Sequence, residues 1–339
     1  MVRINSNVRF FALWSDKDTT FFIKLHSILQ KFSLSLPSKK TETTMKVLKY
    51  LAAFFLMFST NVCLTSCGDD DEPTPAVDPK DYPQHEFFYV GGIGYKSISG
   101  ADVEVTRLNS LTTPDEYTGD VVIPSTVTYQ GYTYNVVSIG ERAFKGCTRI
   151  NSVTMPESVT KIGKNAFQET SLQSITIGAN VREICEEAFI YNVVLKTVVI
   201  SDRVEKIGSK AFFASTVENI SFGRNLKEIG NAAFYDCDKL TRVRLSDSVS
   251  KIGDYAFQSC GELYSITLGE NTVKIGIKAF ANCPKLKYVM CRAESVPMTA
   301  YSAFIDDPLD ELRVPGFVID YYKALPPWKF FAKFGPIDE

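Results

Sequence analysis

Apolar residues recur in the middle of the chain with a period of 22 or 23 residues. The phrase Ile-Gly-x-x-Ala-Phe begins at Ile139 and returns in six following units, one of which has Cys185 in place of the glycine. This period indicates a repeat protein, because so short a unit buries its apolar face only by stacking on its neighbours. The phenylalanines of the phrase are Phe144, Phe167, Phe189, Phe212, Phe234, Phe257 and Phe280, and a degenerate eighth copy ends at Phe304.

A second apolar phrase, Leu-x-x-Ile-x-Ile, lies between successive copies of the first, as at Leu172, Ile175 and Ile177. Two apolar residues separated by one position predict a short strand with one buried face. A turn that often carries Gly or Pro follows the strand, as at Gly178. The Ala-Phe step predicts a compact helical turn or irregular arc on the opposite side. We therefore predict a repeat solenoid, mainly β, with a parallel strand ladder.

Both ends of such a ladder need caps, because the end coils otherwise expose core and unpaired strand edges. Residues 85–137 are rich in β-forming residues and include Tyr129-Gln130-Gly131-Tyr132, which is typical of a hairpin turn. We predict an N-terminal β cap there, repeats over 138–304 and a C-terminal cap over 305–339. The aromatic residues of that last segment are typical of a lid on the final coil: Phe317, Tyr321, Tyr322, Trp328, Phe330, Phe331 and Phe334.

The extended repeat Ile-Gly-x-x-Ala-Phe-x-x-Cys, the strand phrase and the Val-Pro, Tyr-Tyr and Trp of the tail resemble the BspA-like leucine-rich repeat family. The resemblance covers roughly residues 85–335. It implies a right-handed leucine-rich-repeat-like coil. It also implies a cell-surface protein, and some members of the family are implicated in adhesion to host proteins or other bacteria. Members vary widely in partner, so the resemblance implies the fold more firmly than the ligand.

Residues 45–66 have the pattern of an export signal. Lys46 and Lys49 precede a short apolar run over 50–58, and small and polar residues follow. The ending Leu64-Thr65-Ser66-Cys67 resembles a lipobox, which predicts that Cys67 is lipidated and becomes the first mature residue. Acyl chains would then hold the protein on the membrane. A plain secretory peptide or a buried core helix is the alternative. The lipobox interpretation also makes Met45 the expected start and residues 1–44 a mis-called extension.

The segment 67–84 reads as a tether between the lipid and the folded part. Its acidic cluster, Asp69 to Glu72, follows Cys67 directly and resembles the surface-export signal of some Gram-negative lipoproteins. Prolines between Pro73 and Pro83 favour an extended backbone. We expect an outer-membrane lipoprotein exposed on the cell surface. A solvated acidic linker is the alternative interpretation.

Composition argues against catalysis and against nucleic-acid binding. The chain has 37 basic and 39 acidic residues, so no global basic field attracts nucleic acid. His26 and His85 are its two histidines, and no nucleophile motif lies near His85. The acidic residues Asp306, Asp307, Asp310 and Glu311 are more typical of a solvated loop than of a calcium site. We expect no enzyme, no metal and no cofactor.

Four cysteines occupy one repeat position, three residues after the phenylalanine of the Ile-Gly-x-x-Ala-Phe phrase: Cys147, Cys237, Cys260 and Cys283. A recurrent cysteine in a solenoid is typical of a buried ladder member that behaves as a small apolar residue. Because three of the four fall in consecutive coils, disulfide bonds stay open as an alternative to buried free thiols.

The outward side of the predicted strands is the candidate binding face. Alternation directs the residues that flank the first Ile of each strand to solvent. Most are Ser and Thr, and later coils bring Arg and Tyr, which are frequent binding anchors. The candidates are Asn219, Arg242, Arg244, Tyr264, Thr267 and Tyr288. We expect a protein or glycan ligand, either in adhesion or as a polysaccharide-binding accessory lipoprotein of a glycan-uptake system. The alternative is a soluble strand face without a ligand.

Overall fold

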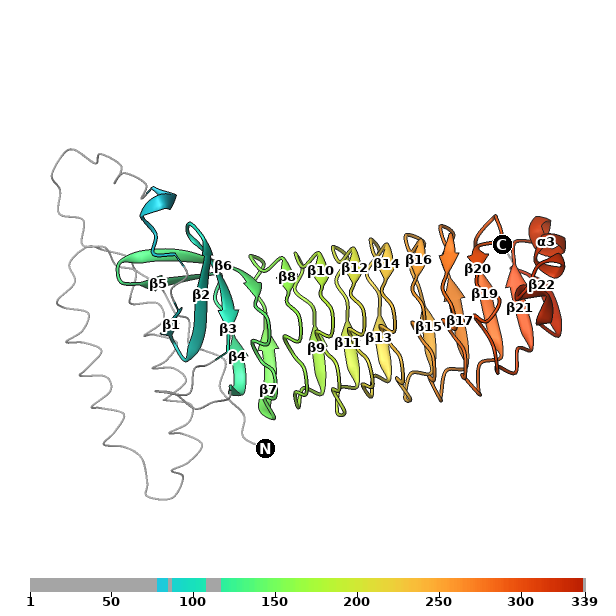
Figure 1. Ribbon diagram of the computed structural model, residues 1–339, viewed down its shortest axis with the longest axis horizontal. Helices are drawn as coiled ribbons and strands as arrows, with labels where there is room; N and C mark the ends of the chain where they lie inside the picture. Colours follow the sequence, from blue (N-terminus) through green and yellow to red (C-terminus); the bar gives the residue numbers. More distant parts are fainter. Residues whose placement is uncertain (1–77, 85–86, 108–116, 338–339) are drawn as a thin grey trace, which may run out of the picture. The chain divides into compact units, whose positions relative to one another are not determined.

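The computed structural model divides the chain into two units, residues 1–74 and 75–339, and describes residues 78–84, 87–107 and 117–337, all within the second. Figure 1 shows the coils of this unit stacked in chain order. The export signal, Cys67, most of the tether and His85 lie outside the described residues. The last residue of each Ile-Gly-x-x-Ala-Phe phrase is called the ladder phenylalanine, and each coil is named below by it.

The Leu-x-x-Ile-x-Ile phrases form parallel strands on one side of the solenoid, called the first ladder, and the prediction of a mainly β solenoid is confirmed. The strands of this ladder fall into three separate sheets. Within a sheet, equivalent strands of successive coils pair in register, as Thr197–Val199 does with Asn219–Ser221. The strands are β7 (Arg149–Thr154), β9 (Ser174–Thr176), β11 (Thr197–Val199), β13 (Asn219–Ser221), β15 (Arg242–Arg244), β17 (Ser265–Leu268), β19 (Tyr288–Cys291), β21 (Glu311–Val314) and β22 (Lys333–Pro336).

A second parallel ladder is built from the residues just before the repeat glycine. Its strands are only two residues long, which is too short to show an alternation of apolar and polar residues, so they could not be predicted from the sequence. They are β8 (Lys161–Ile162), β10 (Glu183–Ile184), β12 (Lys206–Ile207), β14 (Glu228–Ile229), β16 (Lys251–Ile252), β18 (Lys274–Ile275) and β20 (Met298–Thr299). The isoleucines are buried and the Lys or Glu beside them faces outward.

The repeat phenylalanines form the core of the unit. Eight rings, from Phe144 to Phe304, stack with centroids 4.9–5.4 Å apart and planes within 10° of parallel. This distance matches the spacing of about 4.8 Å between paired strands. Tyr117 packs on the first ring at 4.6 Å.

The Ala-Phe arc is irregular, but most of its backbone N–H groups are hydrogen bonded. The residue before Ala and the second residue after Phe have positive φ in coil after coil, as at Lys210 (54°) and Ala214 (50°). Every second N–H then bonds to the next coil, as Phe212 N does to Ala233 O at 2.7 Å, and the others close turns within the coil. The arc is thus a third layer of inter-coil hydrogen bonds.

The repeat glycine lies against the backbone of the preceding coil. A Cβ on Gly230 would lie 2.6 Å from the backbone nitrogen of Ser209. Such a separation leaves no room for a side chain, which explains why glycine recurs at this position. Among the seven full copies of the phrase, Cys185 is the single exception, and its side chain is half-buried.

The N-terminal end of the second ladder continues into three further strands. β1 (Phe87–Val90), β2 (Ile93–Ser99) and β3 (Asp102–Thr106) follow one another antiparallel, and β3 pairs with β6 (Tyr132–Ile139) in parallel. β5 (Thr126–Tyr129) forms the predicted hairpin with β6, and the positive φ of Gln130 and Gly131 is that of a type I′ turn. β4 (Thr118–Val122) covers the edge of β7.

The C-terminal end is covered by short helices and by β22. The helices are η3 (Gly316–Val318), α3 (Ile319–Ala324) and η4 (Trp328–Phe330); a further short helix, η2 (Pro79–Asp81), precedes β1. Of the tail aromatics, Tyr322, Trp328 and Phe331 are buried, whereas others remain exposed: Phe317, Tyr321 and Phe330. Only part of the aromatic set of the tail therefore packs as a lid on the last coil. None of the described helices is long and apolar enough to cross a bilayer.

Candidate binding face

The predicted binding residues lie on the outward side of the first ladder, around β15, β17 and β19. Arg242 and Arg244 flank the buried Val243 on β15, and Arg244 stands opposite Thr267 of β17. Tyr288 of β19 stands opposite Ser265. The structure thus brings Arg242, Arg244, Thr267 and Tyr288 onto one continuous sheet.

Tyr264 precedes β17 and packs against Tyr288 with ring centroids 5.0 Å apart and planes tilted by 55°. A hydrogen bond between the two hydroxyl groups raises the pKa of Tyr288 above its ordinary value. The two rings therefore form an outward-facing aromatic pair beside the arginine strand.

Asn219 lies on the same side of the solenoid but on a different sheet. The first ladder is interrupted between β13 and β15, so that β9, β11 and β13 form a separate sheet of three strands. Asn219 is exposed on β13 and has no ladder partner on β15. It is therefore not part of the hydrogen-bonded face that carries the arginines.

Arg242 and Arg244 are exposed, and their guanidinium groups make no hydrogen bond or ion pair with the described part of the chain. The short-strand ladder differs, because several of its side chains pair between coils; Lys251 contacts Glu228 at 2.7 Å, for example. Two unpaired guanidinium groups on one strand leave a local positive charge that a ligand could neutralise.

A shallow groove of about 330 Å³ lies beside this face. It is lined by Thr267, Tyr288 and Met290 and, on β21, by Glu311 and Arg313. Arg313 Nε donates a hydrogen bond to Glu311 Oε1 at 2.8 Å. In the sequence, Arg313 falls within the predicted C-terminal cap and Glu311 among the acidic residues of a predicted solvated loop. However, Leu309, Leu312 and Val314 repeat the Leu-x-x-Ile-x-Ile phrase, and that signal could have extended the face to β21.

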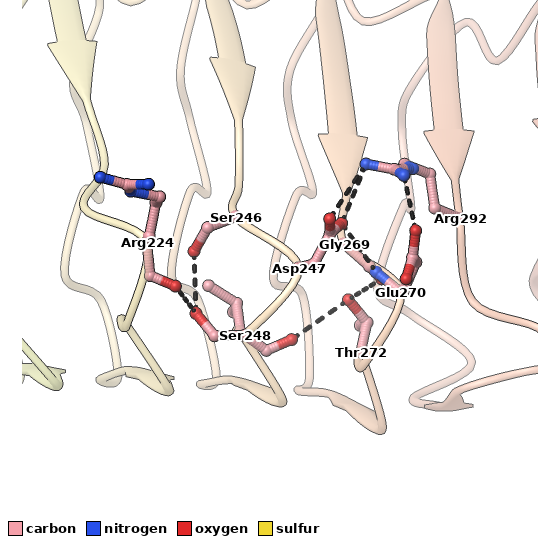
Figure 2. A network of polar contacts seen from close by, with 9 residues as sticks. Arg224, Ser246, Asp247, Ser248, Gly269, Glu270, Thr272 and Arg292 are labelled. Carbon is pink, nitrogen blue, oxygen red and sulfur yellow. Dashed lines mark hydrogen bonds and ion pairs between the residues drawn. The ribbon is translucent and has the colours of Figure 1, made fainter. Parts of the chain in front are cut away.

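The turns that end these strands are joined by a polar cluster (Figure 2). Arg292 Nη1 contacts Asp247 Oδ1 at 3.0 Å across two coils, and its Nη2 reaches Glu270 in the coil between them. Ser248 adds a hydrogen bond from its hydroxyl to Arg224 O at 2.6 Å. The cluster holds together the three coils that carry Arg242, Thr267 and Tyr288, and so fixes the face.

Among the described residues no three or more His, Cys, Asp or Glu side chains gather as a metal site. The six described cysteines are free thiols. Three of the four recurrent ones, Cys237, Cys260 and Cys283, donate to the carbonyl of the ladder phenylalanine one coil earlier, as Cys237 Sγ does to Phe212 O at 3.1 Å. Burial raises the pKa of the Cys237 thiol to about 12, so this thiol stays protonated and remains a donor.

The family model of the BspA type leucine rich repeat region matches the chain in six copies, over residues 124–221 and 184–309. A leucine-rich repeat protein of T. pallidum is 26% identical, with a TM-score of 0.42, and the match covers 63% of this chain and 83% of that one. The pneumococcal vaccine antigen PcpA is 15% identical, with a TM-score of 0.43, and the match covers 76% and 100%. No curated protein matches the chain. Since the family model spans more than half of the sequence, the chain belongs to the BspA-type leucine-rich repeat family.

Proposed function

We propose that this protein is a non-catalytic binding module, displayed on a bacterial cell surface, that contacts a protein or glycan through the face around Arg242 and Arg244. The family supports the general class, since leucine-rich repeat proteins typically bind other proteins and members of this family are commonly found on cell surfaces. The observation that carries the proposed site is the pair of unpaired arginines on a rigid ladder.

The geometry favours an anionic group on the ligand. Arg242 and Arg244 lie on one side of β15, two residues apart, which separates their Cα atoms by about 6.6 Å. A planar guanidinium group binds a carboxylate or sulfate through two parallel hydrogen bonds. Because the backbone is held by ladder bonds on the β17 side, little backbone conformational entropy is lost on binding.

The aromatic pair Tyr264–Tyr288 supports a second candidate, a polysaccharide-binding accessory lipoprotein of a glycan-uptake system. Exposed aromatic rings provide a platform for the apolar face of a sugar, and their hydroxyl groups offer hydrogen bonds. Saccharide binding that depends on the tyrosines and not on the arginines would favour this candidate.

We further propose that Cys67 is lipidated and anchors the protein to the outer membrane. Metabolic labelling with a palmitate analogue should then be lost in Cys67→Ala. Labelling that persists in the variant would exclude this anchor. Protease treatment of intact cells separates surface display from a periplasmic location.

The binding proposal is tested by screening purified residues 68–339 against immobilised matrix proteins and polysaccharides. We expect saturable binding that the Arg242→Ala/Arg244→Ala variant loses. Binding that survives in this variant would move the site to a cap or to another side of the solenoid.

A further inference from the structure

One corner of the solenoid departs from the polar pattern of the repeat. In the coils of Phe144, Phe189 and Phe234, the fourth and fifth positions after the ladder phenylalanine form an exposed corner. The coil of Phe189 has Val193 and Val194 there, with exposed fractions of 66% and 39%. Tyr191, beside them, is 44% exposed. We call Tyr191, Val193 and Val194 the valine ridge. Other coils have polar or charged pairs at this corner, namely Thr148-Arg149 and Asp238-Lys239.

The valine ridge stands between two shorter coils. The coils of Phe167 and Phe212 each have one residue fewer at this corner, where the half-buried Ser171 and Thr216 replace the exposed pair. The ridge therefore extends beyond both neighbours. A shallow groove of about 360 Å³ lies at its foot, with Val193 and Val194 on one side.

A buried hydrogen-bond network holds the valine ridge. Asn192, fully buried, occupies the position that other coils give to cysteine. Its Oδ1 accepts from Thr170 N at 2.9 Å, and its Nδ2 donates to Phe167 O and Phe189 O, both at 2.8 Å. Its backbone N–H donates to Ser215 Oγ at 3.1 Å. Because the residue between Tyr191 and Val193 is fixed on both sides, the ridge is presented in one conformation.

Charge around the groove defines the expected partner further. Lys196 and Glu218 line it and pair with each other at 3.8 Å. Lys239, from the coil of Phe234, also lines it and makes no ion pair with the described residues. The groove thus combines an apolar wall with a lysine at its rim that makes no direct ion pair, although Glu262 lies near enough to interact with it electrostatically.

We propose that the valine ridge and its groove are a docking site for a protein segment that carries an apolar side chain next to a carboxylate. The apolar side chain would bury the valines, and the carboxylate would face Lys239. The residues that line the groove include no aromatic ring on which a sugar could stack, so the chemistry favours a peptide over a saccharide. This site is separate from Arg242 and Arg244 and does not depend on the function proposed for them.

The test uses a phage-displayed library of random peptides selected on the purified chain. We expect enrichment of sequences with Leu, Ile or Phe beside Asp or Glu. Val193→Thr/Val194→Arg, which copies the pair in the coil of Phe144, should weaken the affinity for a synthetic peptide from the selection at least tenfold. Val193→Asp/Val194→Lys, which copies the pair in the coil of Phe234, should weaken this affinity to a similar extent. Lys239→Ala should weaken binding about threefold and flatten its salt dependence, because it removes one charge contact.

Arg242→Ala/Arg244→Ala serves as the control and should leave the peptide affinity unchanged. Both valine variants should keep the melting temperature, since the same residues already occupy this corner in other coils. No enrichment above bare beads, or equal affinity for the unmodified chain and the valine variants, would overturn the proposal.

Discussion

Trp328 packs edge-on against Phe304, with ring centroids 5.4 Å apart and planes inclined by 60°. It closes the C-terminal end of the stack of eight phenylalanines. Trp328 is fully buried, so the cap shields the last ring of the stack from water.

Replacement of Trp328 by alanine should therefore open the C-terminal end of the stack. We expect a loss of about 3–5 kcal/mol in the free energy of unfolding, the usual cost of removing a buried tryptophan. Hydrogen exchange should rise first in residues 280–314. Phe330→Ala is the control, because that ring is 48% exposed, and it should cost about 0.5 kcal/mol. Equal losses in the two variants would contradict the capping role.

Asp307 should make the stability of the cap depend on pH. It lies three residues after Phe304, as Asn192 does after Phe189, and its Oδ1 accepts from Cys283 N at 2.7 Å. Its other oxygen is buried without a partner. Burial raises the pKa of this carboxyl from 3.8 to about 9. Between pH 3.8 and about 9, the folded protein therefore keeps a proton on Asp307 that the unfolded chain has already released.

The free energy of unfolding should then fall as pH rises from about 4 to about 9 and level off above that range. Asp307→Asn should remove this component, because the amide keeps the acceptor and never ionises; Asn192 already fills the equivalent place. The measurement is the difference in melting temperature between the two proteins across pH 4 to 10. A difference that does not change with pH would show that Asp307 is not a buried neutral acid.

Gly230→Ala should destabilise the protein by about 1–3 kcal/mol, because its Cβ would overlap the preceding coil. Gly261→Ala is the matched control: the nearest atom to its Cβ would be Asp238 Oδ1 at 3.4 Å. Chemical unfolding of both variants measures the difference. Similar stabilities would mean that coil spacing does not depend on the glycine.

Arg292→Ala should cost about 1 kcal/mol, because it releases Asp247 and Glu270 from the cluster in Figure 2. The loss should shrink at high salt, which screens these partly exposed pairs. Lys323→Ala removes an exposed contact to Asp320 and a cation–π contact with the Phe334 ring at 5.8 Å, and should cost less than Arg292→Ala. A salt-independent loss for Arg292→Ala would indicate lost packing in place of lost charge contacts.

Much of this fold could be predicted from the sequence, because the repeat period and the alternation of apolar and polar residues in the strands are both visible there. The step between ladder phenylalanines predicts stacked coils, and the strand phrase predicts which side chains face outward. Two-residue strands such as Lys206–Ile207 could not be predicted, because they are too short to alternate. The buried set Thr170, Asn192 and Ser215 was also missed. The sequence places each of them at the cysteine position, but only the structure shows that they are buried and hydrogen bonded to one another.

The candidate site was predicted only in part, because alternation shows which side chains face outward but not which coils share a sheet. Alternation placed Arg242, Arg244 and Thr267 outward, and Tyr264 could be paired with Tyr288 only once adjacent coils were aligned. The interruption beside β13 leaves no mark in the strand phrase, so Asn219 was assigned to the same face although it lies on another sheet.

The most direct test of the binding proposal compares two charge-matched variants in titrations with a partner identified by the screen. Arg242→Ala/Arg244→Ala removes two unpaired cations from the binding face. Lys206→Ala/Lys274→Ala removes two unpaired, exposed cations from the short-strand ladder. We expect the arginine variant to bind at least tenfold more weakly and the lysine variant to bind like the unmodified protein. Equal weakening of both would mean that net charge, and not this face, holds the partner.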